Sequence, residues 1–225
     1  MNNALRLCED GSHTLFSDKA GECYHSTHGA YTESLQIFIN YGLLTVFESL
    51  TLKTVRILEV GFGTGLNALL TSLEAESGAV YVSYLGLEPF PVESEIIRQL
   101  NYCSLLNGNS QQYFDLMHES TWDSTYIIHP SFGFKKQQIG FMDAGLENNG
   151  FDLIYFDAFS PEAQPELWEQ EVFDKCFRIM AKGGVLVTYC AKGKVKRALK
   201  AAGFTIENLP GPPGKREITR ARKLA

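Results

Sequence analysis

The chain has 225 residues, of which 44% are apolar and 12% aromatic, a composition that suits one α/β domain with a packed core. No apolar run is long enough to cross a membrane, and residues 1–20 lack a signal-peptide core, so we expect a soluble, cytoplasmic protein without a membrane partner. The net charge of −6 argues against a protein that binds nucleic acid over its whole surface.

Cysteine and histidine indicate neither a disulfide framework nor a metal site. The five cysteines are scattered and lack a C-x-x-C spacing, which predicts reduced thiols. His25 and His28 are three residues apart and would suit a metal pair, but no third ligand motif lies nearby. We therefore interpret both histidines as ordinary polar residues and predict no metal.

Residues 1–50 are expected to form an N-terminal extension before the core. Phe16 to Tyr24 indicates a loop or short strand, and Thr32 to Ile39 a helix with Thr32 as its cap. Such an extension either covers a ligand or closes one face of the sheet.

The central motif is a buried strand that ends in a glycine turn and opens a helix. Val55 to Val60 is the apolar run expected of a parallel strand covered on both faces. Glycines at every second position after it allow a sharp turn and close approach of a ligand to the backbone. The predicted cofactor-binding residues of this motif are Glu59, Gly61, Phe62, Gly63, Thr64, Gly65 and Asn67.

The spacing favours S-adenosylmethionine (SAM) over a dinucleotide. A dinucleotide fingerprint needs a small residue three positions after Gly63, where this chain has Leu66. Glu59 at the strand end repels a pyrophosphate but suits a zwitterion with an α-ammonium group, as SAM is. Glu88, which ends the next strand, is placed to accept the ribose hydroxyls, although dinucleotide enzymes use the same position. A glycine turn that binds nothing is the remaining alternative.

Residues 101–134 interrupt the alternation of strands and helices, and we expect a small insertion with a hairpin in it. Gln111 to Glu119 indicates a short helix, and two strands follow, joined by a turn at residues 130–133. The third parallel strand is expected to end at residues 141–144, which would bring Asp143 to the ligand-binding edge of the sheet. There Asp143 either binds the exocyclic amine of adenine or caps the next helix.

The fourth strand, Phe151 to Phe156, delivers Asp157 and then Phe159, Ser160 and Pro161 to the same edge. An aspartate at a strand end can be a simple cap. An acid followed by Phe-Ser-Pro in a cofactor crevice is better suited to chemistry, so Asp157 is our candidate catalytic residue as well as a cofactor contact.

The C-terminal part is basic. Residues 191–225 hold ten lysines and arginines against Glu207 and Glu217, which gives +8 for this part and leaves −14 for residues 1–190. A basic tail indicates either a polyanion partner or a merely solvated end. Residues 204–208 and the segment after Pro210 predict a terminal antiparallel strand pair. The glycine motif from Glu59 to Gly65 resembles motif I of the class I SAM-dependent methyltransferases. This resemblance implies one α/β domain of that (Rossmann-like) type with a mostly parallel, seven-stranded sheet.

Taken together, the motifs carry a closer resemblance. The chain resembles the methyltransferase half of the bacterial MnmC family of tRNA wobble-uridine enzymes over nearly its whole length, through Glu59–Asn67, Gly86–Pro91, Asp157–Pro161 with Leu167-Trp168, Thr188-Tyr189, Gly211–Glu217, and Tyr24, Ser26, Glu33 and Phe38 in the extension.

The resemblance implies a reaction. The family's domain methylates the 5-aminomethyl group of uridine, often 2-thiolated, to 5-methylaminomethyluridine, with SAM as the methyl donor and the tRNA anticodon stem-loop as the partner. The oxidase half that uses FAD is not matched, so FAD is not expected, and other enzymes would have to supply aminomethyluridine. No obligate protein partner is predicted.

The same resemblance places the acceptor. Phe90, Phe159 and Pro161 are expected to wall the uracil pocket, and Lys215 and Arg216 to contact anticodon-stem phosphates. The alternative functions are a small-molecule amine N-methyltransferase or a polyamine aminopropyltransferase, which would suit the acidic residues 1–190, and a catalytically silent SAM-binding subunit.

Overall fold

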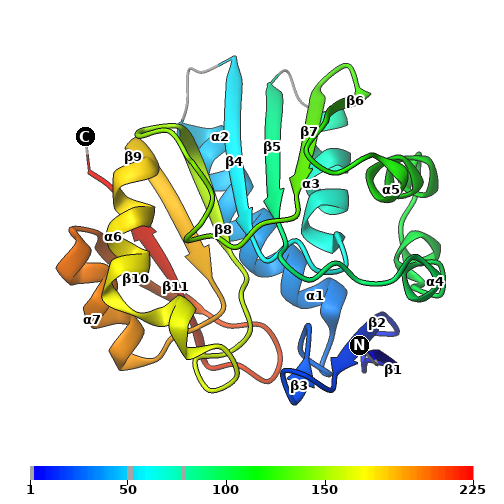
Figure 1. Ribbon diagram of the computed structural model, residues 1–225, viewed down its shortest axis with the longest axis horizontal. Coiled ribbons are helices and arrows are strands. Elements are labelled where there is room, and N and C mark those ends of the chain that lie inside the picture. The colour runs from blue at the N-terminus through cyan, green and yellow to red at the C-terminus, as the bar shows by residue number, and fades with distance from the viewer. Residues whose placement is uncertain (1–2, 50–52, 78–79, 225) are drawn as a thin grey trace.

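The computed structural model describes residues 3–49, 53–77 and 80–224, and its centre is an eight-stranded sheet (Figure 1). In spatial order its strands are β10 (Thr205–Pro210), β11 (Glu217–Arg222), β9 (Met180–Thr188), β8 (Phe151–Phe156), β4 (Thr54–Val60), β5 (Tyr81–Leu87), β7 (Phe132–Gln137) and β6 (Thr125–His129). The five strands from β9 to β7 are parallel. The outer pairs are antiparallel, and the terminal pair β10–β11 was predicted.

The prediction of seven strands is wrong because the hairpin of the insertion joins the main sheet. Its first strand, β6, adds an eighth strand at the edge. Its second strand, β7, is itself the third parallel strand and pairs with β5. The expected strand end at residues 141–144 is therefore also wrong: β7 ends at Gln137, and residues 141–143 form a turn.

Helices cover both faces of the sheet. The helical segments are α1 (Ala30–Ser34), η1 (Leu35–Leu44, a π-helix), α2 (Thr45–Ser49), α3 (Leu66–Ser77), α4 (Ser94–Ile97), η2 (Tyr102–Leu105), α5 (Ser110–Glu119), η3 (Pro165–Trp168), α6 (Gln170–Ile179) and α7 (Gly193–Ala202). Alternate residues of one strand enter opposite cores, as the pleat requires. Leu153 and Tyr155 of β8 pack with η1 and α3, whereas Ile154 and Phe156 pack with α6 and α7. The described helices include none that is long and apolar enough to span a membrane.

The N-terminal extension is more structured than the sequence indicated; residues 1, 2 and 50 of it lie outside the described residues. A small antiparallel sheet of β1 (Asn3–Leu7), β2 (His13–Ser17) and β3 (Glu22–Cys23) precedes the helix. The helix begins at Ala30, so Thr32 is not its cap. The backbone N–H and the hydroxyl of Thr32 instead donate to Asp10, 2.9 Å away in each case. In Figure 1 this small sheet lies beyond the carboxyl ends of the parallel strands.

Candidate active site

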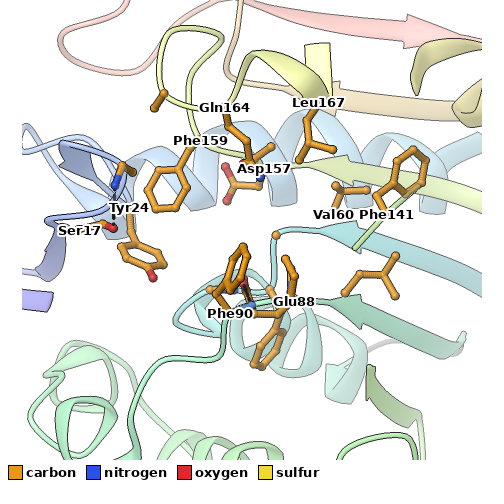
Figure 2. Close-up of a pocket in the computed structure, with 18 of the residues that line it drawn as sticks. Ser17, Tyr24, Val60, Glu88, Phe90, Phe141, Asp157, Phe159, Gln164 and Leu167 are labelled. Carbon is orange, nitrogen blue, oxygen red and sulfur yellow. Dashed lines mark hydrogen bonds between the residues drawn. The ribbon is translucent and has the colours of Figure 1, made fainter. Parts of the chain in front are cut away.

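A cavity of about 190 Å³ lies at the carboxyl ends of β4, β5 and β8, between them and the N-terminal extension. Figure 2 shows Asp157 and Glu88 on its two sides. One end is aromatic and contains Tyr24 and Phe159, and the other is apolar and contains Val60, Phe141 and Leu167 (Figure 2). Apolar walls with a few fixed polar groups are typical of a cofactor site in an open α/β sheet.

Close approach of two backbone segments requires the glycine at position 61. Its φ is +90°, and a Cβ there would lie 2.5 Å from the backbone carbonyl oxygen of Asp157. The Asp157 N–H also donates to the Val60 carbonyl, 3.0 Å away. The turn after β4 and the end of β8 are therefore locked together, which fixes Asp157 relative to the glycine turn.

Asn67, at the start of α3, connects two acids. Its side-chain N–H₂ donates to Glu59 Oε1 at 2.9 Å and to Asp157 Oδ2 at 2.8 Å. Its own Oδ1 is buried without a hydrogen-bond partner, although Asn67 is part of the cavity wall. The asparagine therefore holds the Asp157 carboxyl in place, and its Oδ1 is a buried acceptor that no described group uses.

Glu59 is predicted to bind the cofactor, but the structure places it behind Asn67. The residue is 1% exposed and is not part of the cavity wall. Its second oxygen accepts a hydrogen bond from the Tyr84 hydroxyl at 2.8 Å. Burial raises the pKa of Glu59 well above its ordinary value. The described contacts give Glu59 the role of orienting Asn67.

Asp157 is the carboxyl with the most perturbed environment in the cavity wall. Burial raises its pKa from an ordinary 3.8 to about 8, and Glu33 adds to this rise. The hydrogen bond from Asn67 and the ammonium of Lys215 act in the opposite direction. An acid with a strongly shifted pKa in a crevice is a candidate functional residue. Asp157 is also the residue that the sequence analysis proposed for this role.

Glu88 lies across the cavity, as predicted from its place at the end of β5. Its carboxylate accepts from the backbone N–H groups of Gly63, at 3.0 Å, and Phe90, at 2.9 Å. Burial raises the pKa of Glu88. Each oxygen keeps a second lone pair, so the carboxylate can accept two hydroxyls from a ligand.

The aromatic end is built jointly by the extension and the loop after β8. The Tyr24 and Phe159 rings meet edge to face with centroids 4.9 Å apart. Glu22 accepts hydrogen bonds from the Ser160 N–H at 2.6 Å and the Ser160 hydroxyl at 2.7 Å. The extension therefore forms a wall of the site and not only a cover for one sheet face.

Phe90, a predicted substrate contact, lies at the rim of the cavity. It is 47% exposed, and the Lys19 ammonium sits over its ring at 3.3 Å from the centroid. Pro161 follows Ser160 but is not part of the cavity wall. It acts on the pocket only through the loop that it stiffens.

Asp143 is not brought to the cavity wall. The residue is exposed in the turn after β7, although Gly140 and Phe141 beside it do line the cavity. The expectation that it reaches adenine rested on a strand that ends at residues 141–144, and that strand is absent from the described structure. The alternative role as a helix cap also fails, because no helix follows until η3.

The basic C-terminal part is mostly neutralised within the fold. Six of its ten cations form ion pairs with glutamates: Lys192 with Glu162, Lys194 with Glu169, Lys196 with Glu217, Lys215 with Glu33, and Arg220 and Arg222 with Glu207. Lys223 donates to backbone carbonyls. In the part of the chain that the structure describes, only Arg197, Lys200 and Arg216 of this set are exposed and lack an ion-pair partner.

Several wall residues were not identified as site residues from the sequence: Ser17, Lys19, Ala20, Tyr24, His25, Gln164, Glu166 and Leu167. His25 is 9% exposed, and burial lowers its pKa to about 4. Burial therefore favours the neutral imidazole. Tyr24 and Leu167 stood in motifs of the family resemblance, which was the only signal for this group.

The residues present fit SAM. A Cβ at Gly63 would meet the Tyr24 ring at 3.1 Å, so the glycine leaves a narrow cradle at the turn. The Asp157 carboxyl is an acceptor suited to an α-ammonium group. Glu88 suits ribose hydroxyls, and Val60, Leu87, Phe141 and Leu167 offer an apolar wall for adenine.

Comparison with known proteins agrees with this geometry. A family model described as an S-adenosyl-L-methionine-dependent methyltransferase matches residues 131–224. The chain is 30% identical, over 98% of its length, to the tRNA 5-methylaminomethyl-2-thiouridine biosynthesis bifunctional protein MnmC of Azoarcus sp. (strain BH72). It is also 30% identical, over 96% of its length, to the protein of that name from Cupriavidus metallidurans. The chain spans 35% and 33% of these relatives, about a third of their length.

Two solved structures show the fold. The crystal structure of MnmC2 from Aquifex aeolicus matches all of this chain and 71% of its own, with a TM-score of 0.82 at 24% identity. Spermidine synthase from Thermotoga maritima matches 98% of this chain and 71% of its own, with a TM-score of 0.52 at 11% identity. Together with the family model and the relatives, these matches confirm the resemblance and the methyltransferase fold.

Proposed function

We propose that this chain, a homologue of the MnmC proteins with the fold of SAM-dependent methyltransferases, is an N-methyltransferase of tRNA. Its substrate would be 5-aminomethyluridine at the wobble position, with or without a 2-thio group, and its product 5-methylaminomethyluridine. When bound, SAM supplies a methyl group on a sulfonium sulfur to the acceptor nitrogen. The names of the relatives support this substrate, and the Asp157 carboxyl of this chain supports an amine acceptor.

The observation that carries the proposal is the Asp157 carboxyl, held by Asn67 in the wall between the apolar and aromatic ends of the cavity. A group at that junction faces both the cofactor side and the acceptor side (Figure 2). Because one oxygen is held by Asn67, the other is free to accept a hydrogen bond from an amine. That bond would aim the nitrogen lone pair, and alignment of this kind can supply about 7 to 11 kcal/mol of a barrier.

The raised pKa suits Asp157 to accept the proton that an ammonium must lose. Transfer from an alkylammonium with a pKa of about 10 to an ordinary carboxylate of about 3.9 is uphill by about 8 kcal/mol. With Asp157 at about 8, the same transfer is uphill by only about 3 kcal/mol. The cationic acceptor favours the ionised form of Asp157 on arrival, so the carboxylate is present when it is needed.

The aromatic end fits a uracil ring. Tyr24 and Phe159 present apolar faces beside Asp157, and Phe90 stands at the rim. A wobble base must leave its stacked neighbours to enter such a pocket, and aromatic side chains compensate for the lost stacking. Within residues 191–225, Arg197, Lys200 and Arg216 are the exposed cations without an ion-pair partner, and they would contact backbone phosphates.

The small-molecule alternatives are not favoured. The likeness to spermidine synthase, at 11% identity, concerns the fold alone. The relatives at 30% identity carry names of tRNA enzymes.

The test is methyl transfer from labelled SAM to tRNA from cells that lack this protein, with nucleoside analysis of the product. We expect 5-aminomethyluridine to disappear and 5-methylaminomethyluridine to form. Asp157→Asn should bind SAM but lose about 10²-fold or more in turnover. Label in free amines and none in tRNA would overturn the assignment, and normal turnover by Asp157→Asn would remove Asp157 from the reaction.

A further inference from the structure

Glu33 and Lys215 form an ion pair that interacts electrostatically with the Asp157 carboxyl. Lys215 Nζ is 3.0 Å from Glu33 Oε1, and the two side chains are 27% and 7% exposed. The other Glu33 oxygen, Oε2, accepts a hydrogen bond from the Ser26 N–H at 2.8 Å, whereas Oε1 meets the ammonium at ion-pair distance without a hydrogen bond. This pair joins α1 to the loop before β11, and the reaction as proposed above does not use it.

The loop that carries Lys215 is held against the N-terminal extension. The Lys215 N–H donates to the Pro212 carbonyl at 2.9 Å, and Gln36 donates to the Pro210 carbonyl at 3.0 Å. Gly214 has a φ of +82°, and a Cβ there would lie 2.1 Å from the His28 ring. The ammonium of Lys215 therefore has a fixed position, in contrast to a lysine on an open surface.

That position faces inward. The Lys215 ammonium lies over the Tyr189 ring, 4.9 Å from its centroid. The Tyr189 hydroxyl donates to the backbone carbonyl of Ala158 at 2.8 Å, next to Asp157. Lys215 thus packs on the residue that supports the Asp157 loop, and Arg216 beside it is the exposed cation of this turn.

The two members of the pair act on Asp157 with opposite signs. The negative charge of Glu33 raises the pKa of Asp157, and the positive charge of Lys215 lowers it. Lys215 packs on Tyr189, which is bonded to the residue next to Asp157, so the two charges act on the charge state of Asp157 from outside the cavity wall.

We propose that Glu33 and Lys215 are positioning residues that set the charge of Asp157, and that Lys215 does not contact tRNA phosphate. The effect of this ion pair on catalysis rests on the proposed function, in which Asp157 must be ionised to receive the amine. The other titratable groups that interact with Asp157 come from β4, β5, η2 and the residue after β9, and are Glu59, Tyr84, Tyr102 and Tyr189. Burial raises the pKa of all three tyrosines, so they stay neutral in the working range.

The test is a direct titration of Asp157 in the unliganded protein. Carboxyl ¹³C shifts are followed against pH, and the Asp157 signal is assigned by its loss in Asp157→Asn. Glu33→Gln should lower the Asp157 midpoint by about one unit, and Lys215→Met should raise it by about one unit. Lys215→Arg keeps the charge and should restore the wild-type midpoint. Arg216→Gln removes a cation one residue away and should leave it unchanged.

A pair that only stabilises the fold would not shift the Asp157 midpoint in opposite directions in the two variants. Shifts of both variants in the same direction, or no shift in either, would overturn the proposal. The pH dependence of kcat/KM for methyl transfer should move with each midpoint. Opposite shifts in a protein that methylates no tRNA would support the pair and reject the proposed function, whereas unchanged midpoints in an active methyltransferase would do the reverse.

Discussion

Asn67 Nδ2 lies 2.8 Å from Asp157 Oδ2 and bridges this carboxyl to the carboxyl of Glu59. The Asn67 amide donates one hydrogen bond to each of these two carboxyls. The glycine turn and the Asp157 carboxyl therefore form one unit, and damage to the bridge should affect both.

Asn67→Ala should destabilise the protein and weaken SAM binding. Both acids would lose a donor in a buried place, which costs about 1 to 3 kcal/mol. Urea unfolding at pH 7 measures the first effect and calorimetry with SAM the second. Asn109→Ala is the matched control, because its amide donates to Glu76 at the surface. Equal stability of the two variants would show that the bridge contributes nothing.

Asp157→Asn should stabilise the protein at alkaline pH. A carboxyl whose pKa is higher in the folded chain than in the unfolded chain loses stability as pH rises from about 4 to about 8, because the unfolded state releases its proton first. The amide carries no charge, so the variant should gain about 1 to 3 kcal/mol over the wild type above pH 8.

This gain should shrink towards zero near pH 4, where wild-type Asp157 is protonated in the folded protein. Urea unfolding of both proteins at pH 5, 7 and 9 checks the trend. A gap that widens as pH falls would mean that the Asp157 pKa is lowered by folding and not raised.

Gly61→Ala should disrupt the site more than the same change at another left-handed glycine. Gly108 also has a positive φ, +72°, but a Cβ there would meet no atom within 4 Å. Gly108→Ala should cost only the backbone strain of about 1 kcal/mol. At Gly61 the Cβ would also displace the Asp157 carbonyl, which should add about 1 to 3 kcal/mol and abolish SAM binding. Melting curves and SAM titrations of the two variants make the comparison, and similar losses would show that strain alone matters.

The sequence predicted the parts of the site whose signals are local. A buried strand, a glycine spacing and an acid at a strand end are each readable within about ten residues, which is why Glu88, Asp157 and the turn around Gly61 were found. Phe141 misled the strand assignment because it is apolar for another reason. It packs edge to face on Phe156, with ring centroids 6.3 Å apart, and lines the cavity from a turn.

Long-range packing accounts for what the sequence did not predict. Nothing in the local pattern around Tyr24 or His25 places them on the cavity wall, because their position depends on how the extension folds back over the sheet. The charge available on the surface of residues 191–225 also depends on long-range packing. A count of +8 for residues 191–225 takes no account of Glu33, Glu162 and Glu169, which come from other elements and neutralise three of its lysines.

That pairing leads to a prediction for tRNA binding. Neutralising Arg197, Lys200 and Arg216 together should weaken binding and reduce the slope of log K against log salt concentration by about 0.9 for each phosphate that is no longer neutralised. Lys192→Gln is the control, because this exposed lysine already pairs with Glu162 and should change the slope clearly less. Filter binding between about 50 and 200 mM salt gives both slopes. If the triple variant kept the wild-type slope, the phosphates would have to bind outside residues 191–225, and the positive charge of that part would serve the fold alone.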